Sequence, residues 1–291
     1  MKILIVINAG LSLESFFGCK TQMFETAKKL DIDLEILTNT EIKYYYDNSG
    51  IHTCLPKYDA VLFYSKDTNL AFALEQSGYK VFNSSKAISL CDSKVETYKI
   101  LAENKIKIPK TFVIPLTFFY NEALLENFKN IIVSKLNFPL IAKKWFGSKG
   151  EQVFLIKNKS ELDLLIQKES GKELLFQEFF KECFGTDLRI NIVNGKIVSC
   201  IKRKSTNGDF RSNLSIGSVA ENYLPNDEEK SFALKSAEVL GCDFCGVDIL
   251  QTNMGAVVCE VNSNAQMRLT NKFSGEDIFY DILKYIKEKV C

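Results

Sequence analysis

Two acidic segments near the C-terminus hold residue types that bind metal ions. Asp248 lies within an apolar run, and Glu260 and Asn262 lie on the next predicted strand. If 253–255 forms a three-residue turn with glycine in the left-handed position, Asp248 lies directly opposite Glu260. Side chains alternate along a strand, so Glu260 and Asn262 share one face.

Two neighbouring carboxylates repel each other unless a cation or a proton lies between them. Carboxylate and amide oxygens are hard ligands that suit magnesium. The apolar residues around the acids are expected to face the other way, into the core: Val247, Ile249, Val257 and Val261. This pattern predicts a magnesium site, with a solvated strand face and a surface turn as the alternative.

A lysine precedes a glycine-containing turn near the middle of the chain. Lys143 ends the apolar strand predicted at 138–145, and Gly-Ser-Lys-Gly follows at 147–150. Backbone N–H groups can approach phosphate closely at such a turn while the lysine neutralises its charge. The alternative is a lysine at a strand end beside an ordinary β-turn.

Hydrogen-bonding side chains gather after two further predicted strands. The sequence Gln-Glu-Phe at 177–179 closes one strand, and Asp187 and Arg189 share a face of the next. The loop at 203–213 then holds two arginines, a lysine and two asparagines around a glycine. Such a set suits phosphate or carboxylate oxygens, and an exposed polar loop is the alternative.

The first ninety residues alternate strand and helix signals, which predicts a small parallel α/β layer. No GxGxxG motif follows the first strand, so a dinucleotide-binding domain would lack its phosphate loop. The predicted strands are 2–8, 34–37, 60–64 and 80–83, and the predicted helices are 21–30 and 70–77.

The rest of the chain divides into a mixed region and a region rich in strands. Asn194-Gly195 is a strong hairpin signal within the latter. The predicted strands are 111–114, 138–145, 152–156, 174–180, 187–193, 196–203, 244–250 and 256–262. The predicted helices are 92–104, 122–130, 161–167, 231–240 and 278–290.

The composition is that of an ordinary soluble globular chain. Its 291 residues include 37 basic and 36 acidic side chains, and the net charge of +1 argues against a nucleic-acid or membrane partner. The N-terminal apolar run is too short for a signal peptide or a membrane span, so we expect a cytoplasmic protein. Nine scattered cysteines predict reduced thiols, and the pair Cys242 and Cys245 has no second pair with which to bind zinc.

Taken in order, these segments resemble the ATP-grasp superfamily. The stretch Gly-Asp-Phe-Arg-Ser-Asn at 208–213 is similar to the RimK branch, the α-L-glutamate ligases. The resemblance runs from about Lys80 to the C-terminus. It rests on 92–97, 139, 143, 147–148, 177–179, 187–189, 208–213, 246–248 and 260–262.

The resemblance implies a fold with α/β and α+β parts, namely an ATP-grasp fold after an N-terminal Rossmann-like (pre-ATP-grasp) α/β domain. The N-terminal domain would span 1–90. The ATP-grasp region would consist of a small central subdomain at 91–172 and a C-terminal subdomain with the metal site at 173–291. ATP would lie between these two subdomains.

Carried over position by position, the resemblance also implies the site residues. Those expected to bind ATP are Lys94, Lys143, Gly147, Ser148, Gln177, Glu178, Phe179, Asp187, Arg211, Ser212 and Asn213. The two lysines would contact phosphates, Glu178 and Phe179 would hold adenine, and Asp187 would lie towards the ribose. Asp248, Glu260 and Asn262 would bind magnesium or manganese. Arg203 and Arg211 would be catalytic, stabilising the transferring phosphoryl group.

The implied reaction joins a carboxylate to an amine. A substrate carboxylate would attack the γ-phosphate of ATP, and an amine would displace phosphate from the resulting acyl phosphate. Positioning and charge neutralisation dominate such phosphoryl transfers. The partners would be ATP, a carboxylate and an amine, with glutamate or another amino acid added to a small molecule, peptide or protein.

Two other functions are compatible with the same residues. One is a macrocyclase or tailoring enzyme for ribosomal peptides, and the other is a non-catalytic ATP-binding module. The presence of all three metal-site residues disfavours the second. The loop at 263–268 replaces a small residue, proline and glycine that are common in the family, so the acceptor is not specified. Assembly into a homo-oligomer is also left open.

Overall fold

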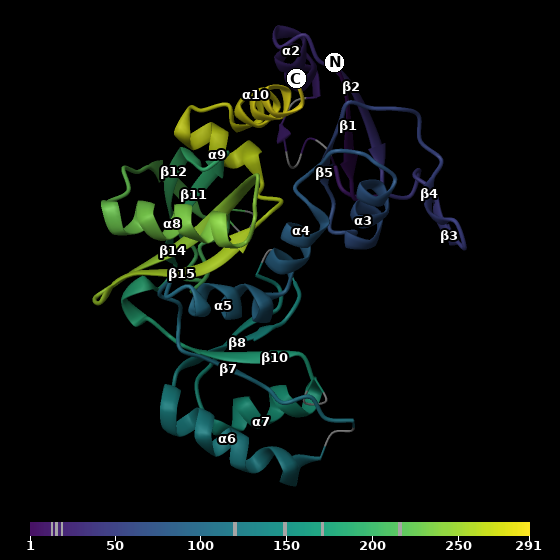
Figure 1. Cartoon of the computed structure of the whole chain (residues 1–291). Coiled ribbons are helices and arrows are strands. Elements are labelled where there is room, and N and C mark those ends of the chain that lie inside the picture. Colours follow the sequence, from purple (N-terminus) through teal and green to yellow (C-terminus); the bar gives the residue numbers. More distant parts are fainter. Residues whose placement is uncertain are drawn as a thin grey trace.

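The computed structural model describes residues 1–12, 14, 17–18, 20–118, 121–147, 150–169, 172–214 and 217–291. The chain forms three parts, which Figure 1 shows as an N-terminal domain and a C-terminal subdomain side by side above a central subdomain. The two termini lie close together at the end of the molecule away from the central subdomain. Among the described residues, no helix combines the length and the apolar composition needed to cross a membrane.

The N-terminal domain contains the parallel sheet that the sequence predicts. Its strand order is β2-β1-β5-β6, and the strands are buried and apolar. The strands are β1 (Lys2–Ile7), β2 (Asp33–Thr38), β5 (Ala60–Tyr64) and β6 (Val81–Phe82). The helices are α2 (Lys20–Lys29), α3 (Thr68–Gln76) and α4 (Ser85–Asp92).

A two-stranded hairpin, β3 (Tyr44–Asp47) with β4 (Gly50–Thr53), was not predicted and projects from this domain in Figure 1. The helix predicted at 92–104 corresponds to α5 (Lys94–Glu103), and the separate helix α4 before it was not predicted. Helix α4 ends at Asp92, and α5 begins with Ser93 as its N-cap, whose side chain accepts a hydrogen bond from the Glu96 N–H. A serine cap therefore separates two helices.

The central subdomain is an antiparallel sheet of order β7-β10-β8-β9, covered by two helices that Figure 1 shows on the side away from the rest of the molecule. Its strands are β7 (Thr111–Val113), β8 (Leu140–Lys144), β9 (Val153–Ile156) and β10 (Leu174–Glu178). Its helices are α6 (Glu122–Leu136) and α7 (Lys159–Lys168). Strand β10, which the predicted boundary assigns to the C-terminal subdomain, pairs with β7 and β8 in this sheet.

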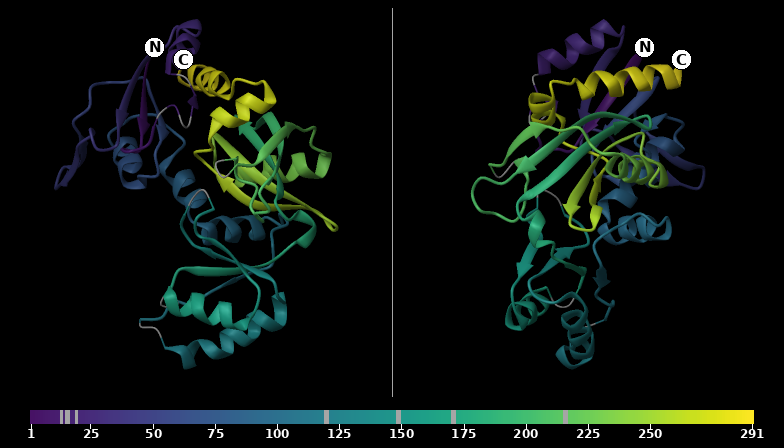
Figure 2. Two further views of the ribbon diagram at one scale, coloured as in Figure 1. Left: turned by 180° about the vertical axis from the view of Figure 1, so that it is seen from behind. Right: turned by 90° about the vertical axis from the view of Figure 1, so that its left-hand side faces the viewer.

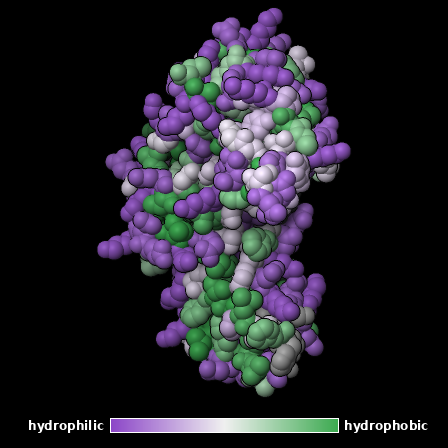
Figure 3. Space-filling model, turned by 45° about the vertical axis from the view of Figure 1, so that its right-hand side comes forward, coloured by the Kyte–Doolittle hydropathy of each residue, from purple (hydrophilic) through white to green (hydrophobic). Residues whose placement is uncertain are grey.

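Apolar side chains also reach the surface of the central subdomain, where Figure 3 shows green atoms over the lower part of the molecule. Large exposed side chains there include Val113, Leu116, Phe118, Leu124 and Ile131.

The C-terminal subdomain is an antiparallel sheet of order β13-β12-β11-β14-β15. Its strands are β11 (Thr186–Val193), β12 (Lys196–Lys204), β13 (Val219–Asn222), β14 (Phe244–Thr252) and β15 (Gly255–Asn262). Its helices are α8 (Asp227–Val239), α9 (Met267–Ser274) and α10 (Ile278–Val290). Strand β13 and helix α9 were not predicted.

The two faces of this sheet have different roles. Leu188, Ile190 and Ile192 are fully buried in a core that includes residues of α5 and α8. Asp187 and Arg189 alternate with them and face the opposite side. Helix α10 packs with the N-terminal sheet in a second shared core, which joins the two parts; Figure 2 shows it beside α2 from both directions.

The hairpin of β14 and β15 brings Asp248 opposite Glu260, as predicted, but by a different route. Thr252 pairs with Gly255, so the turn has two residues rather than three. The register then shifts by one at Cys259, because Ile249 pairs with Val258 while Asp248 pairs with Glu260. A bulge in β15 thus restores the facing acids.

Candidate active site

The three parts of the molecule meet around one large cavity of about 810 Å³, called the large cavity below. The N-terminal domain contributes Tyr64 and Lys66 to its lining, and predicted site residues from the two other regions of the sequence line the rest. They are Lys94, Lys143, Gly147, Gln177, Glu178, Phe179, Asp187, Arg203, Arg211, Ser212, Asn213, Asp248, Glu260 and Asn262. Ser148, the remaining predicted residue, lies outside the described residues.

Asp248 is held by two arginines on neighbouring strands. Arg189 lies opposite it on β11, and its Nη2 donates to Asp248 Oδ2 at 2.8 Å while its Nε bonds the other oxygen. Arg203 Nη2 lies 3.0 Å from Asp248 Oδ1. Burial disfavours the charged carboxylate, but the two guanidinium groups outweigh it and lower the pKa of Asp248.

Arg203 also grips Asp187, its direct neighbour across β11 and β12. Its Nε and Nη2 donate to the two oxygens of Asp187 at 2.7 and 2.5 Å. The side chains of Arg203, Asp187 and Asp248 are all buried. Arg203 therefore joins two carboxylates in one network that forms the wall of the large cavity.

Arg189 was noted in the sequence only for sharing a face with Asp187, and it was not assigned to the site. The structure makes it a main partner of Asp248 and places it on the cavity wall. The two-residue spacing from Asp187, which places both side chains on one strand face, was the available signal.

Glu260 lies opposite Asp248 and next to the lysine at the start of α5. Lys94 Nζ lies 3.7 Å from Glu260 Oε1 and donates to the carbonyl of Gly147 at 3.2 Å. Burial lowers the pKa of Lys94, and the Glu260 charge acts against that shift. Lys94 thus connects the predicted metal site to the predicted phosphate loop.

The predicted metal ligands form a donor set that suits a hard divalent cation. Asp248 and Glu260 supply carboxylates, and each carboxylate has lone pairs beyond those that the arginines and Lys94 occupy. The amide nitrogen of Asn262 is buried and has no hydrogen-bond partner among the described residues. Because amide oxygen and nitrogen are assigned from their partners, the opposite orientation would place an oxygen there for a cation. These residues therefore fit magnesium.

Lys143 ends β8 and reaches into a polar cluster that the sequence did not reveal. Its Nζ donates to the Tyr98 hydroxyl at 3.1 Å and lies 3.6 Å from Cys259 Sγ. The Tyr98 hydroxyl donates to the Cys259 carbonyl and also contacts Gln177 Oε1 at 3.4 Å. Burial raises the pKa of Tyr98 to about 12. The four-residue spacing of Tyr98 from Lys94, which places both on one helix face, could have identified it.

The glycine turn and the 208–213 loop lie against each other. Arg211 Nη1 donates to the carbonyl of Gly150 at 2.6 Å, and its other nitrogens bind Asp209. A Cβ on Gly150 would lie 2.8 Å from Asn213 Nδ2 and 3.0 Å from Arg211 Cδ. Gly150 also has a φ of +75°. The positive φ favours glycine at this position, where the two predicted phosphate-binding segments lie in contact.

The predicted adenine segment connects the central and C-terminal subdomains. Glu178 ends β10, and its carboxylate accepts a hydrogen bond from the Lys110 N–H at 2.6 Å. Beyond it, Phe180 and Cys183 pack with Val257 in a small apolar cluster.

The predicted packing of Val257 with Val247 and its neighbours is therefore wrong, because the bulge at Cys259 reverses the direction of side chains before it.

Cys242 has a partner that its spacing did not indicate. Its Sγ lies 3.5 Å from that of Cys91 at the end of α4. The contact with Cys242, together with burial, raises the pKa of the Cys91 thiol. Across the described part of the chain, no three His, Cys, Asp or Glu side chains are grouped to bind a metal.

This arrangement of sheets is found in a solved ATP-grasp ligase. The structure of PsnB, complexed with a phosphomimetic variant of a minimal precursor, Mg and ADP, matches with a TM-score of 0.70 at 15% identity. The match covers 99% of this chain and 98% of that one. The fold is therefore an ATP-grasp fold, as the sequence predicted.

Sequence similarity identifies the family within the proteins that share this fold. The model of the RimK-like ATP-grasp domain matches residues 91–286. The uncharacterised protein MG012 of Mycoplasma genitalium is 31% identical over 290 residues, covering 98% of this chain and 99% of its own length. A probable alpha-L-glutamate ligase of Shewanella loihica is 33% identical over 245 residues, covering 81% and 78%. The chain belongs to the RimK-like ATP-grasp family and is an ATP-dependent ligase.

Proposed function

We propose that this protein is an ATP- and magnesium-dependent carboxylate–amine ligase that works through an acyl phosphate and adds glutamate or another amino acid to an acceptor. The observation that carries the proposal is the convergence of two groups on one cavity. The first is the network of Asp187, Arg203, Asp248 and Arg189, and the second is Lys94 beside Glu260. The first group offers fixed charges and the second offers a lysine between a carboxylate and a glycine turn.

The proposed nucleotide site runs along the boundary of the central and C-terminal subdomains. Adenine is held at 178–179, beside the connecting segment, and the phosphates lie near Lys94 and Lys143. The contact between Gly150 and Arg211 supports a role of both loops at the phosphates, because backbone N–H groups and a guanidinium suit phosphate oxygens. Ser212, which is buried beside them, supports the same role.

Magnesium would be held by Asp248, Glu260 and Asn262. When bound, it would supply charge neutralisation between a substrate carboxylate and the triphosphate. The residues of the chain prepare this site, because Arg189 and Arg203 keep the Asp248 carboxyl ionised despite its burial. Lys94, which contacts Glu260 and Gly147, orients the glycine turn towards the same point.

In the proposed reaction, an oxygen of the substrate carboxylate attacks the γ-phosphorus of ATP and the bond to the β,γ-bridging oxygen breaks, releasing ADP. The amine then attacks the carbonyl carbon of the acyl phosphate, phosphate leaves, and the amine loses a proton. Arg203 and Arg211 line the cavity in which this charge moves. Their guanidinium groups suit the transferring phosphoryl group, since electrostatic stabilisation dominates such transfers.

The test is ADP release by the purified protein with ATP, magnesium, pooled amino acids and pooled carboxylate acceptors, together with the masses of the products. We expect ADP release that needs both substrate pools, and a product heavier than the acceptor by one amino acid less water. If neither the amino acids nor the carboxylate acceptors stimulate ADP formation by correctly folded protein, the proposal is contradicted. A product that is lighter than a peptide acceptor by one water indicates the macrocyclase instead.

A further inference from the structure

One cation in the large cavity has no protein partner. Among the described residues that line this cavity, Arg268 is the cationic side chain without a hydrogen bond or an ion pair. The paired cations are Lys66 with Asp92, Lys94 with Glu260, Lys143 with Tyr98, Arg189 with Asp248, Arg203 with Asp187 and Arg211 with Asp209. An unpaired guanidinium that faces a cavity is available to an anionic group of a ligand.

Arg268 is an exposed residue whose stem lies near the N-terminal domain. Arg268 lies in the first turn of α9, and a Cβ on Gly18 would lie 3.6 Å from its Cγ. The side chain therefore packs against a glycine of the N-terminal domain. This position places it between the large cavity and a second cavity of about 630 Å³, both of which it lines.

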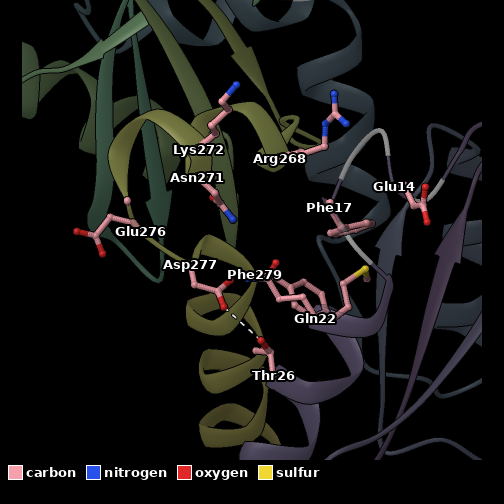
Figure 4. A pocket seen from close by; sticks show the side chains of 13 residues that line it. Glu14, Phe17, Gln22, Thr26, Arg268, Asn271, Lys272, Glu276, Asp277 and Phe279 are labelled. Atoms are coloured by element: carbon pink, nitrogen blue, oxygen red, sulfur yellow. Dashed lines mark hydrogen bonds between the residues drawn. The ribbon is translucent and has the colours of Figure 1, made fainter.

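The described lining of the second cavity has three acids and two cations. Figure 4 shows Arg268 and Lys272 on α9, with Glu14 across the cavity from them. Glu276 and Asp277 also line it, and Asp277 accepts a hydrogen bond from Thr26 at 3.2 Å. The described lining of the large cavity has seven cations and six acids, so its net charge is positive while that of the second cavity is negative. An anionic group bound by Arg268 is therefore repelled less on the side of the large cavity.

The N-terminal domain fixes the segment between Asn262 and Arg268. The Tyr64 hydroxyl donates to the Ala265 carbonyl at 2.5 Å, and Asn264 Nδ2 donates to the Ser65 carbonyl at 2.9 Å. Arg268 therefore lies at the end of the large cavity that the N-terminal domain bounds. The proposed nucleotide residues lie at the other end, between the central and C-terminal subdomains. The group that Arg268 binds thus belongs to a substrate and not to ATP.

We propose that Arg268 binds the carboxylate of the amine substrate and so determines specificity for an amino acid over a simple amine. This inference rests on the proposed function. A guanidinium binds a carboxylate through two parallel hydrogen bonds, which fixes its orientation as well as its position. With the carboxylate held beyond Asn262, the amino group of the same molecule is directed back towards the proposed magnesium site.

The test compares two pools of amine substrates in the ADP-release assay: the twenty amino acids and the same amino acids as α-carboxamides. Wild-type protein is expected to prefer the acids. The substitution Arg268→Gln lowers kcat/KM for the acids by about 10- to 100-fold, mainly through KM, because a hydrogen bond to a charged group is lost. Its preference for acids over amides falls towards one, and its KM for ATP stays unchanged. The substitution Arg268→Lys recovers part of the preference.

Lys272→Gln is the matched control, because it also removes one positive charge from α9. Lys272 lies one turn after Arg268 and lines the second cavity but not the large cavity. It is expected to keep the preference for acids. If Arg268→Gln retains that preference, or if Lys272→Gln loses as much, the inference is overturned and the ligase proposal stands. The inference is also overturned, and the ligase proposal stands, if wild-type protein turns over the amides as well as the acids. If neither pool supports ADP release, the proposed function fails and the inference with it.

Discussion

Replacing Glu260 with glutamine is expected to lower turnover by about 10³-fold or more while the fold survives. Glu260 lies opposite Asp248, and its side chain is 34% exposed. Its ion pair with Lys94 is long, at 3.7 Å, so little folding free energy depends on it. The loss would come from weaker magnesium binding at the phosphates. Steady-state ADP release and its dependence on magnesium concentration measure the effect.

Glu221→Gln provides the control for this change. Glu221 is an exposed acid on β13 of the same sheet, and we expect its substitution to leave turnover and the magnesium dependence as in the wild type. The thermal midpoints of both variants should lie close to that of the parent. If Glu260→Gln keeps more than about a tenth of the activity at limiting magnesium, Glu260 is not a metal ligand.

Replacing Arg203 with methionine is expected to lower the free energy of unfolding by about 3–5 kcal/mol, because it leaves a buried carboxylate without its partner. Arg203 bonds both oxygens of Asp187 and also contacts Asp248, and all three groups are nearly inaccessible to water. Activity should fall with stability, since Arg203 also lines the cavity. Urea unfolding followed by circular dichroism measures the stability.

Lys196→Met is the matched control, because it removes a cation from the exposed start of the same strand. If Lys196→Met lowers the free energy of unfolding as much as Arg203→Met does, the network of Arg203, Asp187 and Asp248 contributes no special stability. The pH dependence gives a second check. The pKa of Asp248 is lowered in the fold, so its contribution to stability is present above the pKa of the unfolded chain, about 3.9, and is lost as pH falls through the folded value. The difference between wild type and Arg203→Met should therefore shrink in acid.

Local patterns were enough to predict most of the elements, and the family resemblance implied most of the residues that meet in the cavity. The alternation around Asp248 and Glu260 predicted facing acids, because a strand with one buried face permits few registers. The order of the lysines, the glycine turn and the arginine loop predicted the family. The first of these signals lies within a few residues of the acids, whereas the second extends from about Lys80 to the C-terminus.

What was missed depends on contacts between distant segments. The bulge at Cys259, which changes the direction of Val257, has no signal in the sequence of β15 alone. Tyr98 reads as an ordinary core residue until the fold brings Lys143 within 3.1 Å of its hydroxyl. Helix α9 is short, and its Gln266 N-cap makes no side-chain capping hydrogen bond, so its start lacked the usual mark. The partners of Arg203 were hidden because pairing across strands fixes them.

The central claim is that a substrate carboxylate becomes an acyl phosphate, and the transfer of ¹⁸O tests it most directly. The acceptor that supports ADP release is labelled with ¹⁸O in its carboxylate, and the inorganic phosphate from a complete turnover is analysed by mass. The proposed reaction predicts one ¹⁸O atom from the carboxylate in each phosphate released, together with ADP. Unlabelled phosphate, or AMP and pyrophosphate in place of ADP, would contradict it.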